Sequence, residues 1–255
     1  MKNRLVSFSL LSLLITCLIL TMPACETNNY TEGLSYTEKT VDGICGYEVS
    51  GIGYSNDIEI IIPSKVDGKA VISIGDHAFS NRKDIISVSL PNSLKEISDW
   101  AFVGCERLEK ILLPTSLTTI GSAAFKDCIN LTEIVIPYNV STIGSSAFWG
   151  CKNIKQASMY ESNAQISDYM FYGCLTLESV ILSDSIIKIG DNAFYNCISL
   201  QNVFYKGTEV SWEQVNIRQN NLNIRNATIY FYSENKPSNV GNYWHFADGQ
   251  SAVWE

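Results

Sequence analysis

The sequence contains few of the side chains that enzymes use for proton transfer and metal binding. His77 and His245 are the only histidines among its 255 residues. No glycine-rich phosphate loop and no paired-carboxylate motif stands out either. We therefore expect a non-enzymatic protein without catalytic residues, cofactors or a metal site. Acidic residues are nevertheless common, so a glycan-active enzyme stays open as a third interpretation.

Positive charge is scarce as well. The chain carries 18 Lys and Arg residues against 26 Asp and Glu residues, a formal net charge of −8. Residues 1–24 hold two positive charges and no negative ones, so their removal would change −8 to −10. This acidic balance disfavours a nucleic-acid partner. It also argues against docking on anionic lipid by charge alone.

The N-terminus has the pattern of an export signal. Lys2 and Arg4 precede an apolar run that reaches Met22, and Pro23-Ala24-Cys25 follows. A transmembrane anchor is the alternative, because the run approaches the roughly 20 residues that span a bilayer. Ala24-Cys25 resembles a bacterial lipoprotein processing site, although Met22 and Pro23 depart from its usual residues. The resemblance implies an exported protein held at the membrane only by lipid on Cys25, with plain secretion as the other outcome.

A unit of 23 residues repeats through the middle of the chain. Six phenylalanines fall on this period: Phe79, Phe102, Phe125, Phe148, Phe171 and Phe194. Apolar columns at i and i+2, such as Val88 and Leu90, predict one short strand per unit with a buried face. A column of Gly, Asn and Asp, beginning with Asn81 and Gly104, predicts a left-handed turn before each strand. Strands over 58–62 and 227–232 are expected as the first and last rungs.

The repeat resembles the BspA-like leucine-rich repeats of bacterial and some protist surface proteins. The spacing L-x-x-L-x-L carries the resemblance. It is clearest from Ile120-Gly121 through Ala124-Phe125, Cys128 and Leu131 to Ile134-Val135-Ile136-Pro137. It implies an α/β-type solenoid dominated by short parallel β-strands, a right-handed leucine-rich-repeat array with N- and C-terminal caps. It also implies adhesion or binding at a cell surface.

The chain divides into four parts on this interpretation. Residues 1–24 are the lipoprotein-type signal, and the polar residues 25–39 are a flexible tether. Residues 40–232 are the solenoid, which begins with a cap hairpin around Asp42-Gly43. Residues 233–255 are an aromatic C-terminal cap that covers the exposed end of the stack.

Five cysteines also follow the 23-residue period: Cys105, Cys128, Cys151, Cys174 and Cys197. Equivalent positions of stacked units lie about 4.8 Å apart, which is within the Cα range of a disulfide. However, side chains of such a column point the same way, and free Cys is among the most buried residue types. We predict a column of buried thiols, with disulfides or a metal site as the alternatives.

The side chains that alternate outward from the predicted strands form the candidate binding face. They are Lys110, Leu112, Glu133, Val135, Gln156, Ser158, Ser179, Ile181, Asn202 and Phe204. Several are apolar on a face for which we expect no covering layer, and exposed apolar patches tend to mark interaction sites. The alternative is that these residues only favour strand formation. Tyr160, which replaces the proline of other units, is a candidate loop contact.

Two functions from different classes follow. The first is a surface-anchored protein that binds a protein or polysaccharide ligand, such as a host matrix protein, through its sheet face. The second is a passive spacer or envelope scaffold without a specific ligand.

Overall fold

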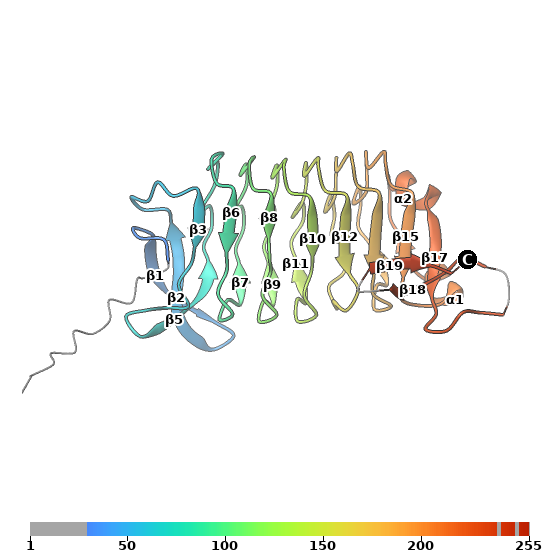
Figure 1. Ribbon diagram of the computed structural model, residues 1–255, viewed down its shortest axis with the longest axis horizontal. Helices are drawn as coiled ribbons and strands as arrows, with labels where there is room; N and C mark the ends of the chain where they lie inside the picture. Colours follow the sequence, from blue (N-terminus) through green and yellow to red (C-terminus); the bar gives the residue numbers. More distant parts are fainter. Residues whose placement is uncertain (1–29, 239–240, 248–249, 255) are drawn as a thin grey trace, which may run out of the picture.

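The computed structural model describes residues 30–238, 241–247 and 250–254, so the predicted signal and Cys25 lie outside the described residues. Short strands repeat along one long axis (Figure 1). The described residues contain two helices of five residues each, α1 (Glu209–Glu213) and α2 (Leu222–Asn226). None of their helices is long and apolar enough to cross a membrane. The predicted solenoid of parallel strands is confirmed.

Each unit contributes one strand to the same side of the solenoid, whose outer surface we call the sheet face. Its strands are β3 (Glu59–Ile61), β6 (Ser87–Ser89), β8 (Lys110–Ile111), β10 (Glu133–Val135), β12 (Gln156–Met159), β13 (Ser179–Leu182), β15 (Asn202–Tyr205) and β17 (Thr228–Tyr232). The strands β3, β6 and β8 pair in parallel as one sheet, and β10 to β17 pair in parallel as another, for example Ile134 with Ala157 and Val180 with Val203. Since β3 and β17 pair with β6 and β15, the predicted first and last rungs are confirmed.

A second strand in most units lies on the other side of the solenoid. These strands are β7 (Glu96–Ile97), β9 (Thr119–Ile120), β11 (Thr142–Ile143), β14 (Lys188–Ile189) and β16 (Asn216–Ile217). The chain reverses between the two sides, so the apolar side chains of both strands point into a shared interior. Ile97, Ile120 and Ile189 are fully buried there.

The interior is built from columns of identical residues. The six repeat phenylalanines are fully buried, and successive rings stack with centroids 5.1–5.5 Å apart. The five repeat cysteines are buried and free. Each thiol donates to the carbonyl oxygen of the phenylalanine one unit earlier, as Cys128 does to Phe102 at 3.2 Å. The predicted column of buried thiols is confirmed.

Two columns of turn residues have left-handed backbone. The predicted column runs from Asn81 to Asn196, with φ between 57° and 72°. The second column, from His77 and Trp100 to Asn192, has φ between 52° and 62° and was not predicted. Its members share no residue type that favours positive φ. Tertiary structure imposes the conformation, because their N–H groups donate to the next unit, as Trp100 does to Ser122 at 2.9 Å.

The N-terminal cap is the predicted hairpin with one boundary corrected. β1 (Ser35–Val41) and β2 (Ile44–Gly51) pair antiparallel around Asp42 and Gly43. β2 then pairs with β5 (Lys69–Ile74), which also pairs with β4 (Lys65–Val66). The tether predicted over 25–39 is wrong for its last part. Leu34 is buried in the core and Ser35 starts a strand, because the open first unit needs apolar cover.

The C-terminal end departs from the period and still continues the stack. β16 pairs with β14, while Val215 and Ile224 fill the core of the last unit. Trp212 of α1 packs against Tyr205, with ring centroids 5.1 Å apart. The chain ends in a hairpin of β18 (Tyr243–Ala247) and β19 (Gln250–Val253), which we call the C-terminal hairpin.

Candidate binding face

Two rows of outward-facing side chains run along the sheet face. The Leu112 row is Ile61, Ser89, Leu112, Val135, Ser158, Ile181, Phe204 and Tyr230, in which the 23-residue period places Leu112 and strand pairing links the residues on either side of it. The Lys110 row beside it is Glu59, Ser87, Lys110, Glu133, Gln156, Ser179, Asn202 and Thr228. Because parallel strands pair in register, equivalent residues of adjacent units stand side by side, about 4.8 Å apart. One row is largely apolar and the other is polar.

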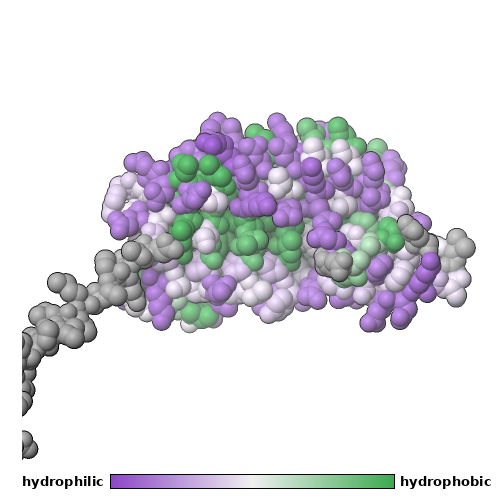
Figure 2. Space-filling view, viewed as in Figure 1, coloured by the Kyte–Doolittle hydropathy of each residue, from purple (hydrophilic) through white to green (hydrophobic). Residues whose placement is uncertain are grey.

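The middle of the Leu112 row is open to solvent. Leu112 is 85% exposed and Val135 is 61% exposed. They line an open groove of about 970 Å³ together with Ser89, Pro114, Pro137 and their neighbours on β6, β8 and β10. Figure 2 shows apolar surface along the middle of this view, with hydrophilic residues on both sides. Large apolar side chains in an open groove are the usual floor of a binding site.

The expectation that the whole sheet face is uncovered is wrong at its C-terminal end. Ile181 is 4% exposed and Phe204 is 7% exposed, because the C-terminal hairpin lies over them. Trp244 of β18 is fully buried, with its ring centroid 5.5 Å from that of Phe204. Its Nε1–H donates to the carbonyl oxygen of Tyr205 at 3.0 Å. The aromatic tail therefore covers part of the candidate binding face and not only the end of the stack.

Tyr160 belongs to the same aromatic cluster. Its ring centroid lies 4.5 Å from that of Phe246 and 5.9 Å from that of Trp244, both edge-on. The amine of Lys206 lies 4.6 Å from the Tyr160 ring centre. These contacts explain why this unit has Tyr in place of Pro: the ring supports the C-terminal hairpin. Its role as a contact for an external ligand stays a prediction.

The predicted polar positions differ in exposure along the face. Lys110 and Glu133 are exposed beside the groove, whereas Gln156, Ser179 and Asn202 are half-buried. Gln156 donates to the Ser179 hydroxyl at 3.3 Å. Ser158 is half-buried as well. Of the predicted residues, Lys110, Leu112, Glu133 and Val135 are the ones that combine exposure with a position in the groove.

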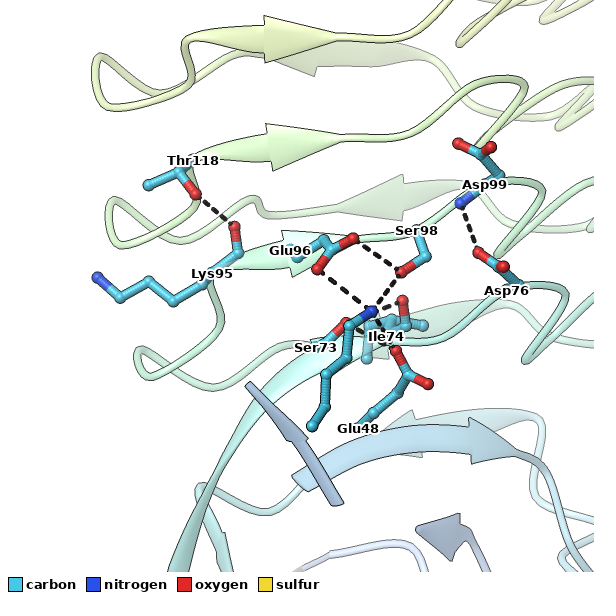
Figure 3. Close-up of polar contacts among 10 residues, drawn as sticks. Glu48, Ser73, Ile74, Asp76, Lys95, Glu96, Ser98, Asp99 and Thr118 are labelled. Atoms are coloured by element: carbon cyan, nitrogen blue, oxygen red, sulfur yellow. Dashed lines mark hydrogen bonds and ion pairs between the residues drawn. The ribbon is translucent and has the colours of Figure 1, made fainter. Parts of the chain in front are cut away.

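A polar cluster near the N-terminal cap was missed by the sequence analysis. The amine of Lys39 contacts Glu48, Glu96 at 3.2 Å, and the hydroxyls of Ser73 and Ser98 at 3.2 and 3.1 Å. Figure 3 shows these oxygens converging from separate strands on one point. The four partners are scattered over 51 positions from 48 to 98, so no local motif reveals them.

The charge of the lysine decides what this cluster can do. Burial opposes the charged amine, but the hydrogen bond to Glu48 and the charges of Glu96 and Glu48 outweigh it and raise the pKa of Lys39. A protonated lysine cannot accept the proton of Ser73 or Ser98, as a Ser-Lys nucleophile would require. The cluster therefore joins β1 to β5 and β7 as a structural clamp. Among the described residues, no three His, Cys, Asp or Glu side chains are placed to hold a metal ion.

Comparison with known proteins agrees with this geometry. The family model described as a BspA type leucine-rich repeat region matches six copies, over residues 55–177 and 153–230. These matches cover more than half of the chain. The chain belongs to this family. Among curated proteins, none matches it.

Solved structures of leucine-rich-repeat proteins are similar to this chain. The leucine-rich-repeat protein of T. pallidum aligns at 23% identity with a TM-score of 0.55, over 74% of this chain and 96% of its own. A leucine-rich-repeat protein of Bacteroides ovatus aligns at 21% identity with a TM-score of 0.40, over 80% and 72%. A leucine-rich cell surface protein of Faecalibacterium prausnitzii aligns at 26% identity with a TM-score of 0.45, over 70% and 42%. Leucine-rich-repeat proteins generally bind other proteins through extended surfaces of this kind.

Proposed function

We propose that this BspA-type protein is a surface-anchored binding module that captures a protein ligand in the groove at β6, β8 and β10. The observation that carries the proposal is the exposure of Leu112 and Val135 in an open groove beside Lys110 and Glu133. An apolar centre with a charged border is the usual layout of a protein–protein interface. A polysaccharide ligand and a passive spacer are the two outcomes that the experiment below separates from it.

The test compares two double variants of equal chemistry. Leu112→Ser with Val135→Ser removes the apolar centre of the groove. Ile187→Ser with Ile198→Ser removes two side chains of similar exposure, 70% each, that lie outside the groove. We expect the first pair to weaken capture of protein ligands from host-matrix and cell-surface extracts about tenfold or more, because few central residues dominate binding. The second pair should leave capture unchanged.

Measurement is by pull-down of protein and polysaccharide fractions, with circular dichroism as the folding control. Capture of polysaccharide alone would replace the protein ligand by a glycan. If both double variants still capture the ligand, the binding site lies outside the groove. The absence of any captured ligand would favour the spacer.

Anchoring is the second part of the proposal, and it concerns residues outside those the structure describes. Ala24-Cys25 after the apolar run supports lipidation of Cys25 and a place on the outer side of a membrane. Metabolic labelling with a fatty acid should mark the wild-type chain and not Cys25→Ser. A wild-type chain that stays unlabelled and appears in the medium would indicate plain secretion instead.

A further inference from the structure

The C-terminal hairpin shows what kind of chain segment the Leu112 row can hold. β18 begins beside β17, where Tyr243 pairs with Phe231. It reaches Tyr160, which directly follows β12, with the Phe246 ring. The side chains of β18 therefore reach successive units along the row, because Trp244 contacts Phe204 of β15 and Phe246 contacts Tyr160 after β12. In Figure 1 the hairpin lies at the C-terminal part of the sheet.

Alternation in β18 determines which of its side chains touch the row. Side chains at i and i+2 of an extended strand share one face. Trp244 and Phe246 form such a pair, and both belong to the cluster over Ile181 and Phe204. His245, between them, stacks on Trp254 at 3.7 Å instead. An extended segment with large apolar residues at alternate positions is thus the occupant that this row already accepts.

The row continues from the covered part into the open part in one register. Ser158 pairs with Ile181 on one side and with Val135 on the other. Leu112 is the equivalent residue one 23-residue unit earlier, and it lines the same groove as Val135. The open part keeps the same layout, with apolar side chains beside the polar Lys110 row. The neighbouring charges, Lys110 and Glu133, have opposite signs, so they select no strongly charged partner.

We infer that the open part of the Leu112 row binds an extended segment of a partner protein whose aromatic or large aliphatic side chains stand at alternate positions. The inference rests on the proposed function and specifies its partner. The partner segment would lie end to end with β18 along the same row. Trp244 and Phe246 would form the boundary of the site, so the C-terminal hairpin limits the ligand to the units from β6 to β12.

The experiment uses a capped hexapeptide as the probe. Its sequence Asn-Ser-Trp-His-Phe-Ala is that of residues 242–247 with serine in place of Tyr243. The isomer Asn-Ser-Trp-Phe-His-Ala has the same composition but puts Trp and Phe on opposite faces of an extended chain. Each peptide is titrated into the full-length chain, and the methyl NMR signals of Leu112, Val135 and Ile181 are followed.

We expect saturable shifts at Leu112 and Val135 with the first peptide, and an affinity about tenfold or more weaker for the isomer. Leu112→Ser with Val135→Ser should abolish the shifts, while Ile187→Ser with Ile198→Ser keeps them. Equal binding of both peptides, no binding at millimolar peptide, or shifts confined to Ile181 would overturn the inference. The pull-down distinguishes these failures from failure of the proposed function, because capture lost with the groove variant would still place a protein ligand in the groove.

Discussion

Phe125→Ala should lower the free energy of unfolding by about 3–5 kcal/mol, the usual cost of truncating a buried Phe. Phe125 is fully buried in the middle of the stack, with ring centroids 5.3 Å from Phe102 and 5.5 Å from Phe148. Its removal leaves a cavity between two rings that cannot move together, because both are held by their own units. The lost stability is the sum of two terms: the transfer free energy of the buried ring, which is no longer gained on folding, and the cost of the cavity that remains.

Urea unfolding followed by circular dichroism measures this change. Tyr138→Ala is the matched control, since Tyr138 is an aromatic residue in the next unit that is half exposed. It should cost less than about 0.5 kcal/mol. A similar small cost for Phe125→Ala would mean that the phenylalanine column does not form the core.

The second large effect is alkaline unfolding driven by the column of thiols. Burial raises the pKa of the Cys105 and Cys197 thiols to about 12. It also raises the pKa of Cys128, Cys151 and Cys174. In the unfolded chain all five ionise near pH 9, so the unfolded state loses protons first as the pH rises. Their contribution to stability is complete below about pH 9 and is lost between about pH 9 and 12.

The expected slope is steep because the thiols act together. Each contributes about 1.4 kcal/mol per pH unit in that window, so five contribute about 7 kcal/mol per unit. A domain with an ordinary stability of about 5–15 kcal/mol should therefore unfold between about pH 10 and 11. The measurement is the free energy of unfolding at several pH values under reducing conditions.

A variant with Ser at Cys128, Cys151 and Cys174 isolates the cause. Serine can still donate to the phenylalanine carbonyls but does not ionise, so the slope should fall to about 3 kcal/mol per pH unit. Cys45→Ser is the control, because Cys45 is exposed and should leave the slope unchanged. An unchanged slope in the triple variant would assign the alkaline loss to other groups, such as Lys39 and Tyr36, whose pKa values are raised by the fold.

Periodic features of the fold could be predicted because each rests on a column of repeated residues. A buried Phe, a buried Cys and a Gly or Asn at positive φ recur every 23 residues, so several residues in the sequence report on the same structural position. The hairpin around Asp42-Gly43 was also predictable, since that pair favours a tight turn by itself. The left-handed column of His77 and Trp100 was not, because hydrogen bonds to the next unit impose it on ordinary residues.

In the candidate site, too, the periodic features could be predicted from the sequence and the non-periodic ones could not. The order of outward residues on each strand follows from a period of two, so the sequence alone determined that Leu112, Val135, Ile181 and Phe204 share one row. Only the tertiary structure decided which of them solvent can reach. Trp244 covers the last two through contacts between residues about 40–63 positions apart, and neither periodicity nor composition encodes such a contact. What a repeat places on its surface is local, whereas what closes over that surface depends on a non-repeating segment that folds back.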